Sequence, residues 1–198
     1  MPAKNTSVTI LYDDKPLRGA ICFGFIPFNG YSLMAAYLGK RLCSLQLCEP
    51  ESEDCVLERL TRRLPDACLL ESADAPDSIA EALEALLDNQ PVHLPPLHVC
   101  GTPFQHKVWE ALVRIPYGEL RTYKELAGCI GHPKAARAVG TAAGANLIGV
   151  MIPCHRLVGA NGMGGFAWGL DAKRYLISRE QSVPDFCVGQ QTLPAALP

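Results

Sequence analysis

Residues 122–145 read TYKELAGCIGHPKAARAVGTAAGA and predict two short helices joined by a tight turn. Thr122 is a favourable N-cap for a first helix over Tyr123–Cys129, because its hydroxyl can accept a hydrogen bond from the first helical turn. A glycine and a proline separate this helix from a second one, expected over Lys134–Ala145. Two short helices at this spacing are typical of the helix-turn-helix, a unit with which many proteins bind DNA. Helix pairs also occur in many enzymes, so the pattern alone leaves both classes open.

The second helix consists almost entirely of alanine and glycine, and Arg137 is its one long side chain beyond Lys134. A helix of this composition can pack closely into a core through its small residues. It is also thin enough to enter a narrow groove in DNA, with Arg137 directed at the bases. Small residues on all sides of the helix favour the second interpretation.

The first half of the chain predicts a mixed α/β domain. Asn29-Gly30 is a strong signal for a hairpin turn between two strands. Ser52 is a suitable N-cap, and apolar residues at helical spacing follow it. The expected strands are Ala20–Pro27, Tyr31–Tyr37 and Leu42–Leu47, and the expected helices are Ser52–Leu64 and Ser78–Leu87.

Three prolines between Asn89 and Leu97 favour extended chain and indicate a linker. The fold class is therefore α/β (α+β), with a mostly helical second domain in which Thr102 caps a helix over Phe104–Arg114. The expected parts are residues 1–96 as an N-terminal α/β domain with its linker, 97–182 as the second domain, and 183–198 as a C-terminal tail.

Composition narrows the class of protein. The chain has 198 residues, 48% hydrophobic and 19% charged, which suits one or two globular domains. No apolar run reaches the roughly 18 residues of a membrane span, and the N-terminus lacks the features of a signal peptide. We therefore expect a soluble intracellular protein, cytoplasmic or nuclear, with no membrane partner.

Charge is unevenly distributed along the chain. Residues 1–91 carry 8 Lys and Arg against 14 Asp and Glu, a net charge of −6, whereas residues 92–198 carry 10 against 6, a net charge of +4. A basic second half favours contact with a polyanion.

Nine cysteines without a spaced framework indicate reduced thiols, most of them small buried apolar residues. Cys43, Cys48 and Cys55 form the one cluster. A structural zinc ion there has weak support, because close Cys-x-x-Cys spacing and a nearby histidine are missing. We expect no cofactor.

The segment VMIPCHRLV over residues 150–158 places a cysteine and a histidine directly after a proline that ends a strand. A thiol is a useful nucleophile only as a thiolate, and a neighbouring base and cation lower its pKa. His155 and Arg156 offer both to Cys154. The alternative is an inert buried cysteine beside a core histidine.

Pro153-Cys154-His155-Arg156, eight residues after Asn146, resembles the signature of the O6-alkylguanine-DNA alkyltransferases. The resemblance covers roughly residues 101–180, whereas residues 1–95 are similar to the family only in pattern and length. The other matching motifs are Gly101–Gln105, Val108-Trp109, Tyr117–Glu119, Thr122-Tyr123, Lys134–Gly140 and Glu180. The resemblance implies a ribonuclease-H-like N-terminal domain and a winged-helix-like C-terminal domain.

The resemblance also implies repair of alkylated guanine in double-stranded DNA, by a protein that acts as a monomer. The O6 position lies within the duplex, so the nucleotide must be flipped out. The helix Ala135–Ala145 would lie in the minor groove, and Arg137 would take the place of the flipped base. The implied DNA-contacting residues are Arg137, Ala135, Ala136, Thr122 and Arg156.

By the same resemblance, Cys154 attacks the alkyl carbon after His155, oriented by Glu180, removes its proton. Tyr123 supplies a proton to the leaving guanine, and Asn146 holds the turn beside the thiol. The thioether product has no good leaving group, so each molecule would act once. The implied pocket residues are Leu157, Phe166, Ala167, Trp168 and Lys173.

Three positions depart from the family pattern. Phe166 replaces a usual tyrosine, Ala143 replaces a common methionine, and Trp168 stands where glycine is frequent. A tryptophan at this position resembles the branch of the family that is fused to bacterial adaptive-response regulators. An inward Trp168 would restrict the pocket to small alkyl groups, whereas an outward one would be core packing.

Two other classes remain open at this point. Alkyltransferase-like proteins bind lesions without removing them, but they lack the cysteine that this chain has at Cys154. A cysteine hydrolase using Cys154, His155 and Glu180 would turn over repeatedly, and the small helix with Arg137 has no role in it.

Overall fold

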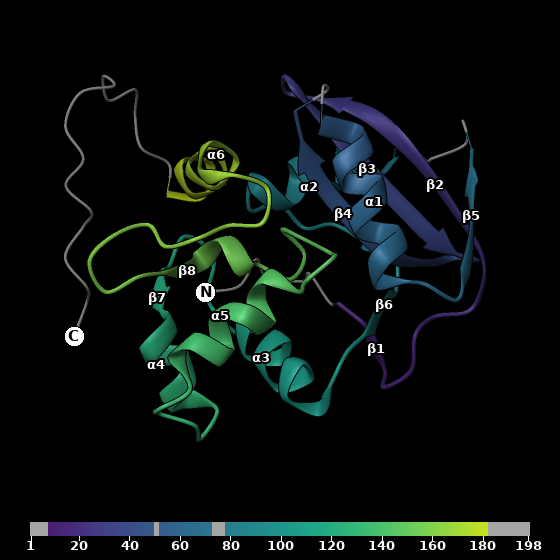
Figure 1. The fold of residues 1–198 in the computed structure, drawn as a ribbon. Coiled ribbons are helices and arrows are strands. Elements are labelled where there is room, and N and C mark those ends of the chain that lie inside the picture. The colour runs from purple at the N-terminus through teal and green to yellow at the C-terminus, as the bar shows by residue number, and fades with distance from the viewer. Residues whose placement is uncertain (1–7, 50–51, 73–77, 182–198) are drawn as a thin grey trace.

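The computed structural model describes residues 8–49, 52–72 and 78–181 (Figure 1). The expected tail, 183–198, lies outside these residues. A sheet with two helices forms one part of the molecule, and a group of helices around two short strands forms the other (Figure 1). None of the helices in the described ranges is long and apolar enough to cross a membrane.

The sheet has six strands in the order β1-β6-β4-β3-β2-β5. The central β2, β3 and β4 are antiparallel, whereas β1 pairs with β6, β4 with β6 and β2 with β5 in parallel. Asn29 and Gly30 both have positive φ values, 50° and 82°, which confirms the predicted tight hairpin turn. The strands are β1 (Ile10–Asp13), β2 (Gly19–Phe28), β3 (Tyr31–Leu38), β4 (Arg41–Cys48), β5 (Ala67–Glu71) and β6 (Leu97–Cys100).

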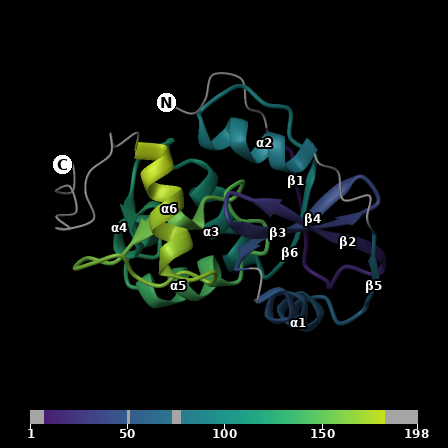
Figure 2. The ribbon, with the colours of Figure 1, turned by 90° about the horizontal axis from the view of Figure 1, so that it is seen from above.

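The helices α1 (Glu53–Arg63) and α2 (Ser78–Leu87) lie on opposite faces of the sheet (Figure 2). Both match the predicted helices closely. Ser52 does occupy the N-cap position of α1, but its side chain makes no capping hydrogen bond, so this prediction was wrong in its mechanism. The first turn of α1 is acidic instead, which suits the positive end of the helix dipole.

Two apolar clusters account for this arrangement. Val56 and Leu60 of α1 pack with residues such as Ile21 on one face of the sheet. Leu83 and its neighbours on α2 belong to a larger cluster on the other face, which continues without a break into the helical part around Leu112. The two parts of the molecule therefore share one core.

The expected boundary between residues 96 and 97 falls directly before β6. Leu97 pairs with Ile10 of β1 and with Leu42 of β4, so β6 belongs to the sheet. The segment of three prolines therefore leads back into the sheet before the chain enters the helical part. Neither β1 nor β5 is predicted by the sequence, because both are short edge strands without clear alternation.

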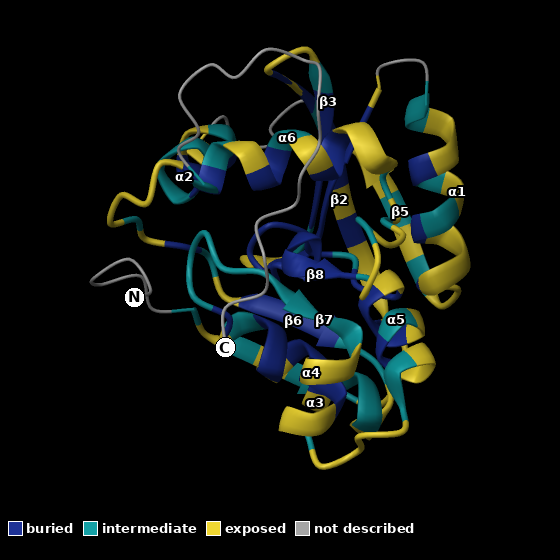
Figure 3. Ribbon diagram, turned by 90° about the vertical axis from the view of Figure 1, so that its left-hand side faces the viewer, coloured by how far each residue is buried: buried dark blue, intermediate teal, exposed yellow. Residues whose placement is uncertain are grey.

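The helical part begins with α3 (Pro103–Val113) and contains α4 (Tyr123–Cys129), α5 (Ala136–Gly144) and α6 (Leu170–Gln181). The predicted helix pair is present as α4 and α5. Helix α5 starts two residues later than expected, because Ala135 donates its backbone N–H to His132 in a turn that holds Lys134 outside the helix. The short strands β7 (Arg121–Thr122) and β8 (Leu157–Val158) pair in parallel, and β8 is buried (Figure 3).

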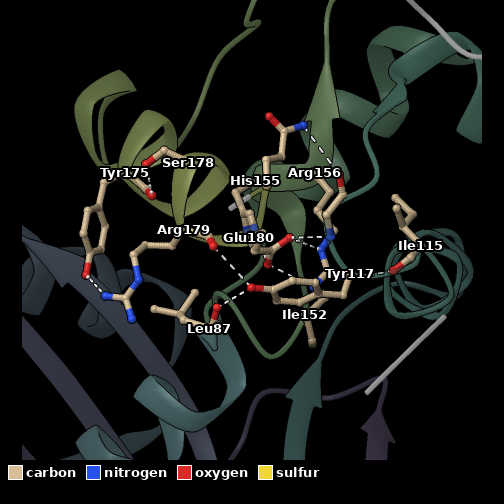
Figure 4. A network of polar contacts seen from close by, with 12 residues as sticks. Leu87, Ile115, Tyr117, Ile152, His155, Arg156, Tyr175, Ser178, Arg179 and Glu180 are labelled. Atoms are coloured by element: carbon tan, nitrogen blue, oxygen red, sulfur yellow. Dashed lines mark hydrogen bonds and ion pairs between the residues drawn. The ribbon is translucent and has the colours of Figure 1, made fainter. Parts of the chain in front are cut away.

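Helix α6 is tied to the sheet part through Arg179. Its guanidinium donates to Glu84 at 2.8 Å and to Asp88 at 2.6 Å, both next to or on α2. Tyr117 also donates to the backbone oxygen of Arg179, at 3.3 Å, and to that of Leu87 (Figure 4). These contacts fix the C-terminal end of α6, where Glu180 lies.

Thr102 forms a full capping box at the start of α3, with its hydroxyl accepting from Gln105 N–H and the Gln105 side chain accepting from Thr102 N–H. We expect Thr102→Ala to lower the free energy of unfolding by about 1 kcal/mol, measured by urea denaturation. Thr102→Ser keeps the hydroxyl and is the matched control. Equal losses in both variants would contradict the capping role.

Candidate active site

The Cys154 thiol lies in a short helical turn, Cys154–Arg156, directly after Pro153. Asn146 Nδ2 donates to Cys154 Sγ at 3.3 Å and to the backbone oxygen of Ile152 at 2.9 Å. Asn146 Oδ1 accepts from Ile148 N–H at 2.9 Å. Asn146 therefore contacts both the turn before Cys154 and the thiol itself, as the resemblance implies.

The electrostatic surroundings of Cys154 differ from the expectation that His155 and Arg156 lower its pKa. Burial raises the pKa of the thiol above its ordinary value, and the Asn146 hydrogen bond and the charges of Lys173 and Arg59 act against this rise. The thiol is therefore protonated at rest, and its reaction needs a base.

Glu180 is the centre of a buried network that it forms with His155 and Arg156 (Figure 4). Its Oε1 lies 2.7 Å from His155 Nε2 and 2.9 Å from Arg156 Nη2, and its Oε2 lies 2.8 Å from Arg156 Nε. Burial alone would raise the pKa of Glu180, but the hydrogen bonds from His155 and Arg156, together with the charge of Arg156, lower it to about 2. Glu180 is therefore ionised at neutral pH.

Arg156 is buried, which contradicts its assignment as a DNA-contacting residue. Its side chain is about nine-tenths buried, and its third nitrogen, Nη1, donates to Ile115 O at 2.6 Å. All three of its nitrogens bind protein groups. Two of them bind Glu180, because an ionised carboxylate in the interior needs a compensating charge.

His155 is fully buried. Burial lowers its pKa, although the hydrogen bond and charge of Glu180 act in the opposite direction, and the ring is neutral at neutral pH. Its Nδ1 is buried and has no hydrogen-bond partner among the described residues. A neutral imidazole held at one nitrogen, with the other nitrogen available, is the form of a general base.

Two backbone groups complete the network without any signal in the sequence. Gly118 N–H donates to Glu180 Oε2 at 3.3 Å, and Ile115 O accepts from Arg156. Gly118 has a φ of 74°, and a Cβ there would lie 3.0 Å from Glu180 O. The turn itself is readable from the sequence, but its contact with a residue 62 positions away is not.

A pocket of about 590 Å³ opens beside Cys154, between α4, α5 and the loop before α6. It contains seven of the predicted site residues: Thr122, Tyr123, Ala136, Arg137, Cys154, Phe166 and Ala167. Three predicted lining residues, Leu157, Trp168 and Lys173, are not part of its wall, and Ala135 lies outside it. Exposed Lys124 and Ala160 also line the pocket and are missed by sequence reasoning.

Helix α5 agrees with both interpretations of its small residues, close packing in the core and a thin exposed face. Val139, Ala142 and Ala143 are buried, and Ala142 O accepts from Trp109 Nε1 at 2.9 Å. The opposite face, which includes Arg137, is exposed. The helix thus packs closely on its inner side and presents a thin outer side.

Tyr123 stands at the wall of the pocket. Its hydroxyl donates to Gly165 O at 3.2 Å, and its ring lies so close to Gly164 that a Cβ there would be 2.8 Å from Tyr123 Cε2. Burial and the nearby Cys154 raise the pKa of Tyr123. The hydroxyl therefore keeps its proton at neutral pH.

Lys173 is not part of the pocket wall, but it binds the loop that forms one side of the pocket. Its Nζ is enclosed by three backbone oxygens, those of Leu157 at 2.6 Å, Met163 at 2.5 Å and Gly165 at 3.1 Å. Burial lowers the pKa of Lys173 to about 8, and the charge of Cys154 acts against this fall. Lys173 thus organises the loop that carries Phe166.

Trp168 points away from this pocket, which corrects its assignment as a pocket residue. It lines a separate cavity of about 350 Å³ against α1. Its ring packs on Gly149, where a Cβ would lie 1.2 Å from Trp168 Cη2, and it contacts Phe166 edge-on at 5.0 Å between ring centroids. The structure favours core packing over the inward orientation.

The three cysteines considered for zinc are not arranged as a metal site. Cys43 Sγ donates to Ala36 O at 3.2 Å, Cys48 Sγ donates to Ser32 O at 3.6 Å, and Cys55 is exposed on α1. Within residues 8–49, 52–72 and 78–181, no group of three or more His, Cys, Asp or Glu side chains is placed to hold a metal ion.

Residues 103–182 match the family model for the DNA-binding domain of 6-O-methylguanine DNA methyltransferase. The crystal structure of Mycobacterium tuberculosis O6-methylguanine methyltransferase is similar to this chain, with a TM-score of 0.67 and 34% sequence identity. The similarity covers 83% of this chain and 95% of the Mycobacterium tuberculosis chain. The chain belongs to the O6-alkylguanine-DNA alkyltransferase family.

Other members of this alkyltransferase family match shorter parts of the chain. The methylated-DNA–protein-cysteine methyltransferase of Methanosarcina acetivorans is 57% identical over 83 residues, 41% of this chain and 53% of that protein. The regulatory protein ada of Salmonella typhimurium is 40% identical over 133 residues, 66% of this chain and 37% of that protein. The chain spans about half the length, or less, of these curated relatives. The similarity to ada agrees with the predicted branch.

The contact of Trp168 with Gly149 can be tested by a double-mutant cycle. We expect Gly149→Ala to lower the free energy of unfolding by about 1–3 kcal/mol, because the new methyl group overpacks the ring. In a Trp168→Gly background the same change should cost much less. Urea denaturation of the four proteins measures the coupling, and additive effects would contradict the contact.

A second prediction concerns acid stability. The pKa of Glu180 is about 2, below its ordinary 4.5, so the ionised carboxylate stabilises the fold above about pH 4.5, and this contribution is lost as the pH falls toward 2. The gap in unfolding free energy between wild type and Glu180→Gln should shrink over that range. Exposed Glu81→Gln is the control and should follow the wild type. A gap that stays constant with pH would argue against an ionised Glu180.

Proposed function

We propose that this protein transfers an alkyl group from O6 of guanine in double-stranded DNA to Cys154, once per molecule. The observation that carries the proposal is the position of Cys154 at the wall of a pocket formed by the helix pair α4–α5, while the next residue, His155, is paired with Glu180 at 2.7 Å. A thiol at the wall of such a pocket, followed in the chain by a neutral imidazole, suits chemistry on a base taken out of the duplex.

The reaction begins with loss of the thiol proton. His155 accepts it, through a water molecule at Nδ1 by resemblance to the family, and Glu180 stabilises the imidazolium. Cys154 Sγ then attacks the alkyl carbon, a C–S bond forms, and the C–O6 bond breaks with its electron pair passing to guanine. Tyr123 donates its proton to guanine N3, and Lys173 and Arg59 stabilise the transient thiolate.

The product is a thioether and free O6 on guanine. A thioether offers no leaving group for water, so the alkyl group stays on Cys154. Asn146 keeps the sulfur directed at the pocket during the displacement, through the hydrogen bond that it makes at rest.

DNA binding is assigned to the exposed face of α5. Arg137 lies on the rim of the pocket with its side chain exposed, and Ala135, Ala136 and Thr122 lie beside it. We propose that α5 enters the minor groove and that Arg137 fills the space of the flipped nucleotide. The Mycobacterium tuberculosis relative, with a TM-score of 0.66 and 34% identity, has been solved in complex with DNA, which supports DNA as the partner. We expect the protein to act as a monomer.

The direct test is intact-mass measurement after incubation with duplex DNA that contains O6-methylguanine. We expect one added methyl group per protein, at Cys154 by peptide mapping. Cys154→Ala should lose the transfer and still bind DNA. Methyl on another cysteine would refute the assignment, and repeated turnover would favour the hydrolase class instead.

The role of Arg137 is tested by comparing substrates. Because flipping costs a few kcal/mol, Arg137→Ala should slow repair of duplex DNA by about tenfold or more, since each 1.4 kcal/mol is a factor of about ten. Its reaction with free O6-alkylguanine base should be nearly unchanged. Arg114→Ala removes the same charge from an exposed site on the end of α3 and is the control. Equal losses on both substrates would mean that Arg137 serves the fold.

A further inference from the structure

Arg59 reaches from the sheet part of the molecule to the wall of the Cys154 pocket. It lies on α1, and its Nη1 donates to Ala167 O at 2.9 Å. Its Nη2 donates to Gln46 Oε1 of β4, and its Nε is buried without a partner among the described residues. An arginine held in this way has a fixed orientation, because its planar fork is bound at two points.

Ala167 is the residue that Arg59 holds, and it separates two cavities. It lines the pocket of Cys154 and also the cavity that contains Arg59 and Trp168. A hydrogen bond to its backbone oxygen therefore fixes the position of this wall. Lys173 fixes the same loop from the other side, at Gly165 O.

Gln46 connects Arg59 to the segment that carries Asn146. Gln46 is fully buried, and its Nε2 donates to Ser44 Oγ at 2.8 Å. Ser44 Oγ in turn donates to Leu147 O at 3.2 Å, and Leu45 N–H donates to the same oxygen at 2.8 Å. Buried polar side chains are costly unless they are bonded, and these bonds run from the Asn146 segment to the pocket wall.

Three charged or titratable groups on other elements interact with Cys154. Lys173 on α6 and Arg59 on α1 favour its ionised form, and Tyr123 on α4 interacts with it electrostatically. His155 lies next to Cys154 in the same turn. The pKa of Lys173 is about 8, so its charge fades at alkaline pH. Burial lowers the pKa of Arg59 below its ordinary value, but a guanidinium starts from so high a pKa that Arg59 keeps its charge where that of Lys173 fades.

We propose that Arg59 is a positioning residue for alkyl transfer, which holds the pocket wall at Ala167 and supplies a permanent positive charge that stabilises the Cys154 thiolate. The sheet part of the molecule then takes a direct part in the reactivity of a thiol that lies in the helical part. The proposal rests on the alkyl transfer proposed above.

The test measures the thiolate directly. Cys154 is alkylated with iodoacetamide across a pH series and followed by peptide mass spectrometry, which separates it from the other cysteines. We expect Arg59→Met to raise the pH midpoint by about one unit, the lower end of the effect of a nearby charge. At neutral pH, methyl transfer should slow by about tenfold for the same reason, because only the thiolate attacks.

Two further variants separate charge from structure. Arg59→Lys keeps the charge and should bring the midpoint back near the wild-type value, while methyl transfer stays slower because the two-point hold on Ala167 and Gln46 is lost. Arg62→Met, an exposed arginine on the same helix, should leave the midpoint and the rate unchanged. If Arg59→Met does not fold, Gln46→Met tests the same hold and should raise the midpoint by a smaller amount.

A midpoint that is unchanged in Arg59→Met, or in Gln46→Met where Arg59→Met does not fold, overturns the proposal, even if thermal stability or the transfer rate falls. The iodoacetamide reaction needs no DNA, so it tests Arg59 independently of alkyl transfer. Failure of the wild-type protein to accept a methyl group refutes the proposed function instead.

Discussion

The buried carboxylate of Glu180 is the interaction on which the site depends. An ionised carboxylate in the interior is costly unless it is paired, and here Arg156 balances its charge while His155 remains neutral. Glu180 lies on α6, its partners His155 and Arg156 lie on the turn after Pro153, and Gly118 lies on the loop before β7. The side chain of Glu180 therefore joins three segments that are distant in the sequence. Removing the charge of Arg156 would leave His155 to supply it, and the ring would lose the neutral form that the proposed mechanism requires.

The features that could be predicted from the sequence are those set by local chemistry. Thr102 and Thr122 cap their helices because the groups involved lie within four residues, and Asn29-Gly30 forms a turn for the same reason. The Asn146 contact with Cys154 and the Glu180 contact with His155 were reached through the family resemblance and not from spacing. The direction of a side chain that contacts distant residues could not be predicted from the sequence. Arg156 points into the protein and Trp168 points away from the Cys154 pocket, and the residues next to them in the sequence do not determine either orientation.

The sheet part is more than a support for the helical part. The polar side chains Ser44 and Gln46 occur on β4, whose other residues are mostly apolar, and both are fully buried. Gln46 binds the guanidinium of Arg59, which itself contacts the pocket wall at Ala167, and Ser44 links Gln46 to Leu147. The family model matches residues 103–182 and does not include β4 or α1, so this link is a feature that comparison of the matched segment alone does not reveal.

The packing of Trp168 on Gly149 has a consequence for divergence within the family. The ring occupies the volume that a side chain at position 149 would need, so the two positions cannot vary independently. A homologue that carries a small residue at the position of Trp168 is free to have a Cβ at that of Gly149, and we expect the pair to co-vary across homologous sequences. The strand expected before Pro153 is a turn in the structure, with Val150 at a φ of 62°. A chimaera that exchanges the loop before α6 without this turn would inherit either a steric clash or a cavity.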